Sequence, residues 1–302
     1  AGGPGSMKTT IAVNIAYQAV KDGKNVLYLS LEETTLQLFS KLLARVSVDI
    51  QKPLNINDIT QSKLSSEDQT VLFDKVLPYL ENLSGSFQMI GDNDLASYEF
   101  SHLESKFKLI DKYFKNKHND DHGIDLIVVD HIQLLKYASS TKDEYKVMNE
   151  YVAFFRKQSL SFLGEDRQIS VILLSQVNRE GIGYAQRHDG MYQMQHVAEA
   201  SEVERASSYI ISTYTDAMAQ VTKHVKIGTI KLRNASLPMD TINVYAEGAY
   251  YQVGDVSVRE QQDYNMDDIN NVDNLKENLV AKDILAEFNL NEKEKSKIWQ
   301  RI

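Results

Sequence analysis

The residues Ala1-Gly2-Gly3-Pro4-Gly5-Ser6-Met7-Lys8-Thr9-Thr10 open the chain, and an apolar-periodic segment follows at once in residues 11–20. A glycine-rich turn at the start of a helix offers backbone N–H groups and the positive end of the helix dipole to a polyphosphate. The adjacent Lys8 and Thr9 suit an ammonium group on the outer phosphates and a hydroxyl on magnesium. This stretch therefore predicts an α/β fold that binds a nucleoside triphosphate.

The spacing of the loop follows the pattern G-x-x-x-x-G-K-[ST] except at one position. Gly2 fits the first glycine, whereas Met7 replaces the second. We expect Met7 to be tolerated with right-handed backbone angles, because only a positive φ strictly favours glycine. The alternative, a flexible terminus left by cloning, does not account for the Lys-Thr-Thr sequence and the helix. The residues predicted to bind the nucleotide are Gly3, Pro4, Gly5, Ser6, Met7, Lys8, Thr9 and Thr10.

Beyond the loop, short β-rich runs alternate with helical stretches, which predicts parallel strands joined by crossover helices. The expected strands are residues 26–30, 87–90, 126–129, 171–174 and 209–212, and the expected helices are 36–46, 98–114 and 147–163. Three further runs at residues 225–232, 241–246 and 249–253 predict an antiparallel extension of the same sheet. Glycine-rich loops of this kind normally follow a buried strand, so we expect at least one core strand, or a whole N-terminal domain, to be missing from the numbered chain.

The chain is expected to divide into three parts. Residues 1–253 form the α/β domain, and residues 254–274 form an acidic linker rich in Asn and Asp. Residues 275–302 contain two helical pieces with a tight turn between them. This small helical tail is either a helix-turn-helix that reads DNA or a segment that docks on a neighbouring subunit.

Polar side chains follow three of the expected strands at their carboxyl ends, where open α/β sheets bind ligands. Asp130 is placed for the magnesium shell, although an acid there also caps a following helix. Either Glu32 or Glu33 could polarise the attacking water, but acids also suit the first turn of a helix. Ser175 and Gln176 end another strand, where an amide senses the γ-phosphate unless the pair is only a surface turn.

Composition limits the class of protein. A chain of 302 residues with 42% hydrophobic content can bury a large core, and it has neither an apolar run of about 20 residues nor a signal-like start. We therefore expect no membrane association. The absence of cysteine excludes disulfides and thiolate chemistry and suits a reducing cytoplasm. A net charge of −9 disfavours a protein that coats nucleic acid, but it allows a ring with a few cations in its channel.

Residues 1–253 resemble the motor domain of DnaB-family replicative helicases. The similar segments are VLYLSLEE at residues 26–33, LIVVDHIQLL at residues 126–135 and LSQVNR at residues 174–179. Lys231-Leu232-Arg233-Asn234 is similar to the family's K-x-R-N near the end of that domain. The resemblance implies a RecA-like P-loop NTPase fold and a DNA helicase that uses ATP and Mg²⁺ to unwind duplex DNA during replication.

Within one subunit, the resemblance implies a role for each matching residue. Lys8 and Thr9 bind the nucleotide and magnesium, and Asp130 belongs to the magnesium shell. Glu32 is the catalytic base, and Gln176 is the sensor of the γ-phosphate. These roles assign the chemistry of hydrolysis to three strand ends and the first loop.

Between subunits, the resemblance implies that Lys231 and Arg233 reach a neighbour's nucleotide, although alternate residues on a strand can also simply face solvent. It implies a homo-oligomer, with a hexameric ring expected, on single-stranded DNA in a bacterial or phage-infected cell, with primase or a helicase loader as a further partner. The family's channel loop R-E-S-G-S-I-E corresponds here to AEASEVE, without its arginine and its glycine. The backbone N–H groups of Glu199, Ala200 and Ser201 remain as candidate contacts to DNA phosphates.

Two other classes of protein share part of this pattern. A RecA-like strand-exchange or clock-type ATPase has the phosphate loop and Asp130, but it is not expected to carry Lys231-Leu232-Arg233-Asn234 in this place. A non-translocating assembly platform from a phage or a defence system would use nucleotide only to hold subunits together. Met7 and the altered channel loop favour this last alternative slightly.

Overall fold

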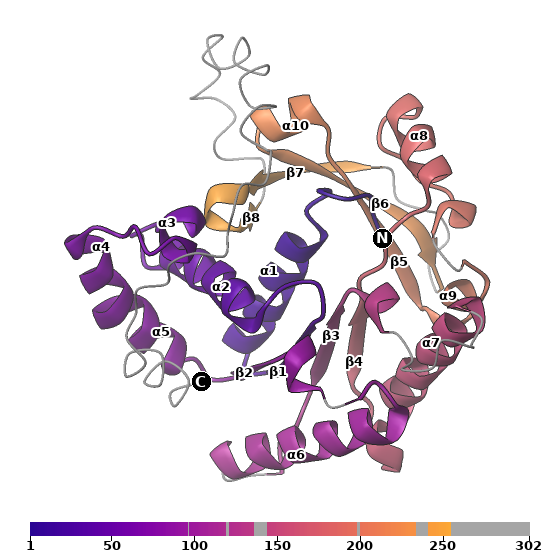
Figure 1. Cartoon of the computed structure of the whole chain (residues 1–302), viewed down its shortest axis with the longest axis horizontal. Helices are drawn as coiled ribbons and strands as arrows, with labels where there is room; N and C mark the ends of the chain where they lie inside the picture. Colours follow the sequence, from indigo (N-terminus) through magenta and orange to yellow (C-terminus); the bar gives the residue numbers. More distant parts are fainter. Residues whose placement is uncertain (96, 119–120, 136–143, 198–199, 234–240, 255–302) are drawn as a thin grey trace.

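A computed structural model of the chain describes residues 1–95, 97–118, 121–135, 144–197, 200–233 and 241–254. These residues form two β-sheets with helices packed around them (Figure 1). Most of the predicted acidic linker and the whole predicted helical tail lie outside the described residues. Among the helices in the described ranges, none is both long and apolar enough to cross a membrane.

The first sheet has four parallel strands in the order β2-β1-β3-β4. Its strands are β1 (Asn25–Ser30), β2 (Ser86–Gly91), β3 (Leu126–Asp130) and β4 (Ser170–Leu173). The register places Ser30 beside Gly91 and Asp130, so the carboxyl ends of three strands meet at one edge. The prediction of parallel strands is confirmed for these four runs, and this edge carries the predicted site.

Helices cover both faces of the parallel sheet, as they do where strands are buried on both sides. On β1, Val26 and Tyr28 belong to one hydrophobic cluster, and Leu27 and Leu29 belong to the other, because side chains alternate along a strand. The helices against the first cluster are α1 (Lys8–Lys21) and α2 (Thr35–Asp49), and those against the second are α6 (Phe100–His118) and α7 (Glu144–Leu160). The helices predicted at residues 36–46, 98–114 and 147–163 are confirmed.

The sequence pattern does not predict several short elements. Each spans too few residues for a helical period to emerge. They are α3 (Ile56–Thr60), α4 (Ser66–Val71), the π-helical turn η1 (Leu72–Val76), α5 (Leu77–Glu81), α8 (Arg179–Arg187), α9 (Ala200–Ala206) and α10 (Ala217–Val221), with the 3-10 turns η2 (Asp92–Asp94), η3 (Ile132–Leu134), η4 (Phe162–Gly164), η5 (Met194–His196) and η6 (Gly248–Tyr250). Side-chain caps fix the start of four of these α-helices, since Asn55, Ser65, Asn178 and Asp216 each accept a bond from a backbone N–H.

The second sheet is antiparallel, with the strand order β5-β6-β7-β8. Its strands are β5 (Tyr209–Tyr214), β6 (His224–Leu232), β7 (Ile242–Glu247) and β8 (Gln252–Gly254). The prediction that residues 209–212 join the first sheet is wrong, because β5 belongs to the second sheet, where it pairs with β6 in antiparallel register. Towards the first sheet, its bridge to Gly2 is parallel, as predicted. The short connection from β5 to β6 suits a hairpin and not a crossover.

Gly2 joins the two sheets. It makes isolated parallel bridges to Gln176, which follows β4, and to Thr213 in β5. A Cβ atom on Gly2 would lie 2.3 Å from Ser6 Oγ and 2.6 Å from the Thr213 carbonyl oxygen, so only glycine permits this approach. The sequence predicts that the antiparallel strands extend the first sheet. They form a second sheet instead, which is connected to the first through the start of the phosphate loop.

Candidate nucleotide-binding site

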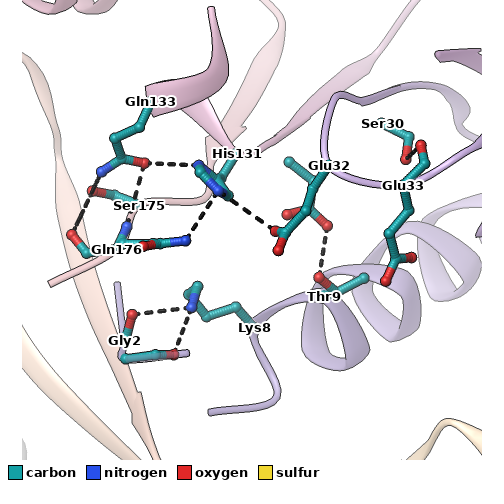
Figure 2. Close-up of polar contacts among 12 residues, drawn as sticks. Gly2, Lys8, Thr9, Ser30, Glu32, Glu33, His131, Gln133, Ser175 and Gln176 are labelled. Atoms are coloured by element: carbon teal, nitrogen blue, oxygen red, sulfur yellow. Dashed lines mark hydrogen bonds and ion pairs between the residues drawn. The ribbon is translucent and has the colours of Figure 1, made fainter. Parts of the chain in front are cut away.

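The glycine-rich loop lies at the carboxyl edge of the parallel sheet and leads into α1, which begins at Lys8. Ser6 Oγ is 3.0 Å from Thr213 Oγ1, so the loop is tied to β5. Lys8 Nζ donates to the carbonyl oxygens of Gly2 at 3.0 Å and Gly3 at 2.7 Å (Figure 2). Burial lowers the pKa of Lys8, and the charges of Asp130 and Glu32 oppose that shift. The loop thus holds a half-buried cation above its own backbone.

Met7 does not have the right-handed backbone angles expected from the sequence. Its φ is 62° and its ψ is 24°, which is the left-handed region. An L-residue in this conformation costs roughly 1–2 kcal/mol because its Cβ crowds the following carbonyl oxygen. The expectation is therefore wrong, and the loop keeps the backbone conformation that the missing glycine would adopt freely.

Asp130 connects the loop to the end of β3. Its carboxylate is buried, and Oδ2 accepts hydrogen bonds from Thr9 Oγ1 at 2.8 Å and from the Tyr28 hydroxyl at 2.8 Å. Tyr28 is completely buried in β1, and this burial raises the pKa of its hydroxyl well above the usual value. The structure therefore brings together Thr9 and Asp130, the two residues predicted to hold magnesium, and it adds Tyr28, to which the sequence pattern assigned no role.

The oxygen atoms at this position suit a magnesium ion that is carried by a nucleotide. A hydroxyl and a carboxylate are hard oxygen ligands, and Mg²⁺ in such sites takes only one or two protein ligands besides water and substrate phosphates. No group of three or more His, Cys, Asp or Glu residues that could hold a metal ion occurs in the described part of the chain. The donor set at Thr9 and Asp130 therefore fits a shared nucleotide–metal site and not a metal cage made by the protein alone.

Glu32 and Glu33 follow β1 and point in different directions (Figure 2). Glu33 forms an ion pair with Lys41 of α2, and Lys41 lies over the ring of Tyr251. Glu32 Oε2 lies 3.5 Å from His131 Nε2, and the Glu32 side chain is 55% exposed. The ion pair occupies the Glu33 carboxylate, so Glu32 has the better geometry for a general base.

Gln176 belongs to a polar network at the ends of β3 and β4 (Figure 2). Its side-chain Nε2 is 3.1 Å from His131 Nε2, and its backbone N–H donates to Gln133 Oε1 at 3.4 Å. Gln133 Nε2 donates to Ser175 Oγ at 2.8 Å. The sequence pattern gives no role to His131 or Gln133. The signal that could have found them is their position directly after a strand-terminal acid, at the edge where ligands bind.

Lys231 and Arg233 lie away from the phosphate loop of their own chain. Lys231 pairs with Ile210, so it lies about 10 Å along the strand direction from Thr213, which contacts the loop. Lys231 Nζ donates to the carbonyl oxygens of Glu204 and Ser207, and Arg233 Nη2 donates to the Arg205 carbonyl oxygen at 2.9 Å. The structure does not bring these cations to the site formed by Lys8.

Arg233 also lines an open cavity of about 430 Å³ beside the carboxyl end of α7. The other basic side chains of the cavity are Arg156, Lys157 and Arg205, and the acidic Glu202 lines it as well. The predicted DNA contact at Glu199 lies outside the described residues, and only the backbone of Ala200 and Ser201, at the start of α9, is described. Asn234 also lies outside the described residues.

A phosphate loop before α1, with an acid and an amide at neighbouring parallel strand ends, defines a P-loop NTPase of the RecA-like type. The predicted fold class is thus confirmed. The chain also matches the family model of the DnaB-like helicase C terminal domain over residues 1–254, and it belongs to that family. Membership implies nucleotide use.

Known relatives agree with this assignment. The replicative DNA helicase DnaB of Helicobacter pylori is 22% identical over 219 residues, which are 72% of this chain and 39% of that protein. The DnaB of Buchnera aphidicola subsp. Schizaphis graminum is 27% identical over 214 residues, which are 70% and 41%. The chain thus spans about two fifths of the length of the curated relatives it matches.

Solved structures show the same fold. One of them, described as an ATPase domain, superposes with a TM-score of 0.66 at 18% identity and covers 85% of this chain and 83% of that chain. A DnaB-like replicative helicase, described with its interactions with primase, has a TM-score of 0.66 at 17% identity over 85% of this chain and 56% of that chain. Together with the family match, these findings confirm the sequence resemblance to the DnaB family.

Proposed function

We propose that this chain is the ATP-hydrolysing motor of a ring helicase, which moves along single-stranded DNA and unwinds duplex DNA during replication. The observation that supports it best is the 2.8 Å contact between Thr9 Oγ1 and Asp130 Oδ2 beside the Lys8 loop. This contact joins the loop to the strand end, where a nucleotide and its metal ion would bind together. The named relatives are replicative DNA helicases, which favours this motor over other P-loop ATPases.

Within one subunit, the loop from Gly3 to Thr10 would hold the phosphates of ATP, and Lys8 would leave its loop carbonyls for the outer phosphates. Thr9 and Asp130 would hold Mg²⁺, which supplies positive charge against the phosphate oxygens when bound. Glu32 would accept the proton of the attacking water, and the Gln176 amide would contact the γ-phosphate. His131 Nε2 lies 3.1 Å from the Gln176 amide nitrogen and 3.5 Å from the Glu32 carboxylate, so these last two side chains lie at one edge of the sheet.

Between subunits, we propose that Lys231 and Arg233 reach the nucleotide of a neighbour in a closed homo-oligomer, for which a hexamer is expected. Their position at the carboxyl end of β6 supports this role, because they are remote from the phosphate loop of their own chain. Backbone groups of Glu199, Ala200 and Ser201 remain the candidate contacts to single-stranded DNA. The solved relative described with primase makes primase a candidate partner.

The test is ATP hydrolysis with and without single-stranded DNA, measured for the wild type, Glu32→Ala, Arg233→Ala and a mixture of the two variants. DNA should stimulate the wild type, and each variant alone should be nearly inactive. The mixture should recover activity, because an intact Glu32 in an Arg233→Ala subunit can receive Arg233 from its Glu32→Ala neighbour. Arg187→Ala is the matched control, since Arg187 also bonds a helix carbonyl on the surface.

The proposal would be wrong if hydrolysis were independent of subunit concentration and the mixture stayed inactive. A chain that hydrolyses ATP and forms rings but ignores DNA would point to the non-translocating platform. Electron microscopy of the nucleotide-bound protein separates closed rings from the open filaments of a strand-exchange ATPase.

A further inference from the structure

We propose that His131 is a positioning residue of this site, which orients the Gln176 amide beside the Glu32 carboxylate. The inference rests on the nucleotide hydrolysis proposed above. The His131 side chain follows β3 directly and is only 6% exposed. Its Nε2 atom lies 3.1 Å from Gln176 Nε2 and 3.5 Å from Glu32 Oε2 (Figure 2). A single ring nitrogen therefore faces both the proposed sensor and the proposed base.

Gln133 determines which nitrogen of the ring carries the proton. Its Oε1 accepts from the Gln176 backbone N–H, and its Nε2 donates to Ser175 Oγ, so two contacts fix the orientation of this amide. The same Oε1 lies 3.1 Å from His131 Nδ1, and an oxygen acceptor there requires a proton on Nδ1. In the neutral ring, Nε2 is then an acceptor, which matches the donor that Gln176 presents.

The consequence for Gln176 is a restrained amide. An NH₂ group has two donors, and His131 accepts one of them. In the view of Figure 2, the Gln176 amide nitrogen lies between the His131 ring and the end of Lys8. The second N–H is thereby kept in one orientation for a phosphate oxygen. A donor that is already oriented needs no reorganisation when charge develops in the transition state.

The consequence for Glu32 is a link to β3. Its carboxylate is more than half exposed, and an exposed glutamate side chain has many accessible rotamers. The loop that carries it is bonded to the His131 strand, because the Leu31 N–H donates to the Asp130 carbonyl oxygen at 2.8 Å. With the proton on Nδ1, His131 Nε2 has no hydrogen to offer the carboxylate, so Glu32 is placed beside His131 by its loop and not by a bond to the ring. His131 therefore orients the Gln176 amide at the place where the loop bond brings the proposed base.

The test compares the full chain with His131→Phe, which keeps a ring of similar size without nitrogen, and His131→Gln, which restores a polar amide. For the Phe variant, kcat should fall about 100-fold, the effect of a misplacement of about 1 Å. KM and the affinity for a non-hydrolysable ATP analogue should stay within about twofold, because ground-state binding is not involved. The affinity for ADP with aluminium fluoride, which mimics the transferred phosphoryl group, should fall with kcat.

His131→Gln should recover much of the loss, and His118→Phe is the matched control, because His118 bonds Ser86 Oγ at the amino end of β2, away from the site. A double variant with Gln176→Ala should lose little more than the worse single variant, since residues that act as a unit are not additive.

Four results would overturn the inference while leaving the proposed hydrolysis intact, and the first three concern kcat. They are an unchanged kcat in His131→Phe, losses that multiply in the double variant, and equal losses in the Phe and Gln variants. A change confined to the Mg²⁺ requirement would also overturn it, because the effect would then pass through Asp130. A wild-type chain that binds ATP without hydrolysing it would refute the proposed function, and the inference with it.

Discussion

The edge of the parallel sheet and the end of β6 both carry residues predicted to act on ATP, yet their surroundings differ. At the sheet edge, Asp130, His131 and Tyr28 are buried, and each is bonded to another side chain of the site. At the end of β6, Lys231 and Arg233 donate to backbone carbonyls of the α9 region, and Arg233 is exposed. The side chains of the first region are held by one another within one chain. Within the described part of the chain, the two cations of the second region bond only to neutral carbonyl groups.

This difference indicates where each region finds its ligand. A buried, bonded cluster is oriented in advance, so a ligand costs little reorganisation there. Cations that rest on neutral carbonyl groups give up little when a phosphate replaces those contacts, since charge-assisted bonds are the stronger ones. The sheet edge is therefore suited to hold a nucleotide in one subunit, and the end of β6 is suited to meet one that another subunit presents.

The largest expected effect is on nucleotide affinity, which should fall for a variant at the sheet edge and not for one at the end of β6. Lys8→Ala should abolish measurable binding of an ATP analogue and reduce hydrolysis by about 1,000-fold, because a preorganised cation beside the phosphates is lost. Lys231→Ala should leave analogue binding by the isolated subunit unchanged. Fluorescence titration with a labelled ATP analogue measures both. Equal losses of affinity in the two variants would contradict the comparison.

A second prediction tests the geometry of the arginine at the end of β6. Arg233→Lys keeps the charge but loses the planar fork, so hydrolysis by the assembled protein should fall by about 100-fold. Nucleotide affinity should not change. Steady-state kinetics at several protein concentrations are the measurement. If lysine restored full activity, only charge would matter, and a transition-state role for a guanidinium group would be excluded.

A third prediction concerns the hydrogen bond between Tyr28 and Asp130 at the sheet edge. Tyr28→Phe removes one donor from Asp130 Oδ2 and should raise the Mg²⁺ concentration needed for half-maximal activity by about 10-fold, as loss of an outer-shell partner does. Tyr17→Phe is the matched control, because Tyr17 is also buried and donates to a carboxylate, that of Asp49, at 3.0 Å. An unchanged Mg²⁺ titration for Tyr28→Phe would show that this bond does not support the metal site.

The smallest effect concerns stability and not activity. Met7→Gly should raise the free energy of unfolding by about 0.5–1 kcal/mol, because release of the left-handed strain exceeds the entropy cost of glycine. Met7→Ala keeps the strain and should give no gain, so it isolates the backbone effect from the side chain. Chemical denaturation measures both variants. A glycine variant that is less stable than the wild type would mean that the methionine side chain contributes more than the strain costs.

Much of the fold could be predicted from local sequence. The loop before α1, the four parallel strands and the three long helices each have a period or a motif that their own residues reveal. The second sheet was only partly predictable, because strand pairing depends on which segments meet in space. β5 has the apolar pattern of the parallel strands, and only its hairpin with β6 and the bridge from Gly2 decide which sheet it joins.

The candidate site divides in the same way. The sequence identifies Lys8, Thr9, Asp130 and Gln176, because strand ends and glycine-rich loops have local signatures. The position after a strand does not choose between two adjacent glutamates, the family resemblance favours Glu32, and the ion pair of Glu33 with Lys41 supports that choice. The sequence also gives the wrong backbone angles for Met7, since the closed loop and not the residue type sets them.

The sequence by itself predicted a phosphate-binding loop before a helix, and it placed acids and amides directly after buried strands. These properties are local, because a motif or a period of a few residues encodes them. Only the tertiary structure decided that Tyr28, His131 and Gln133 join the site and that Lys231 and Arg233 lie away from it. Hydrogen bonds between residues about 40 to 100 positions apart have no local signature, so they exist only once the sheet has assembled.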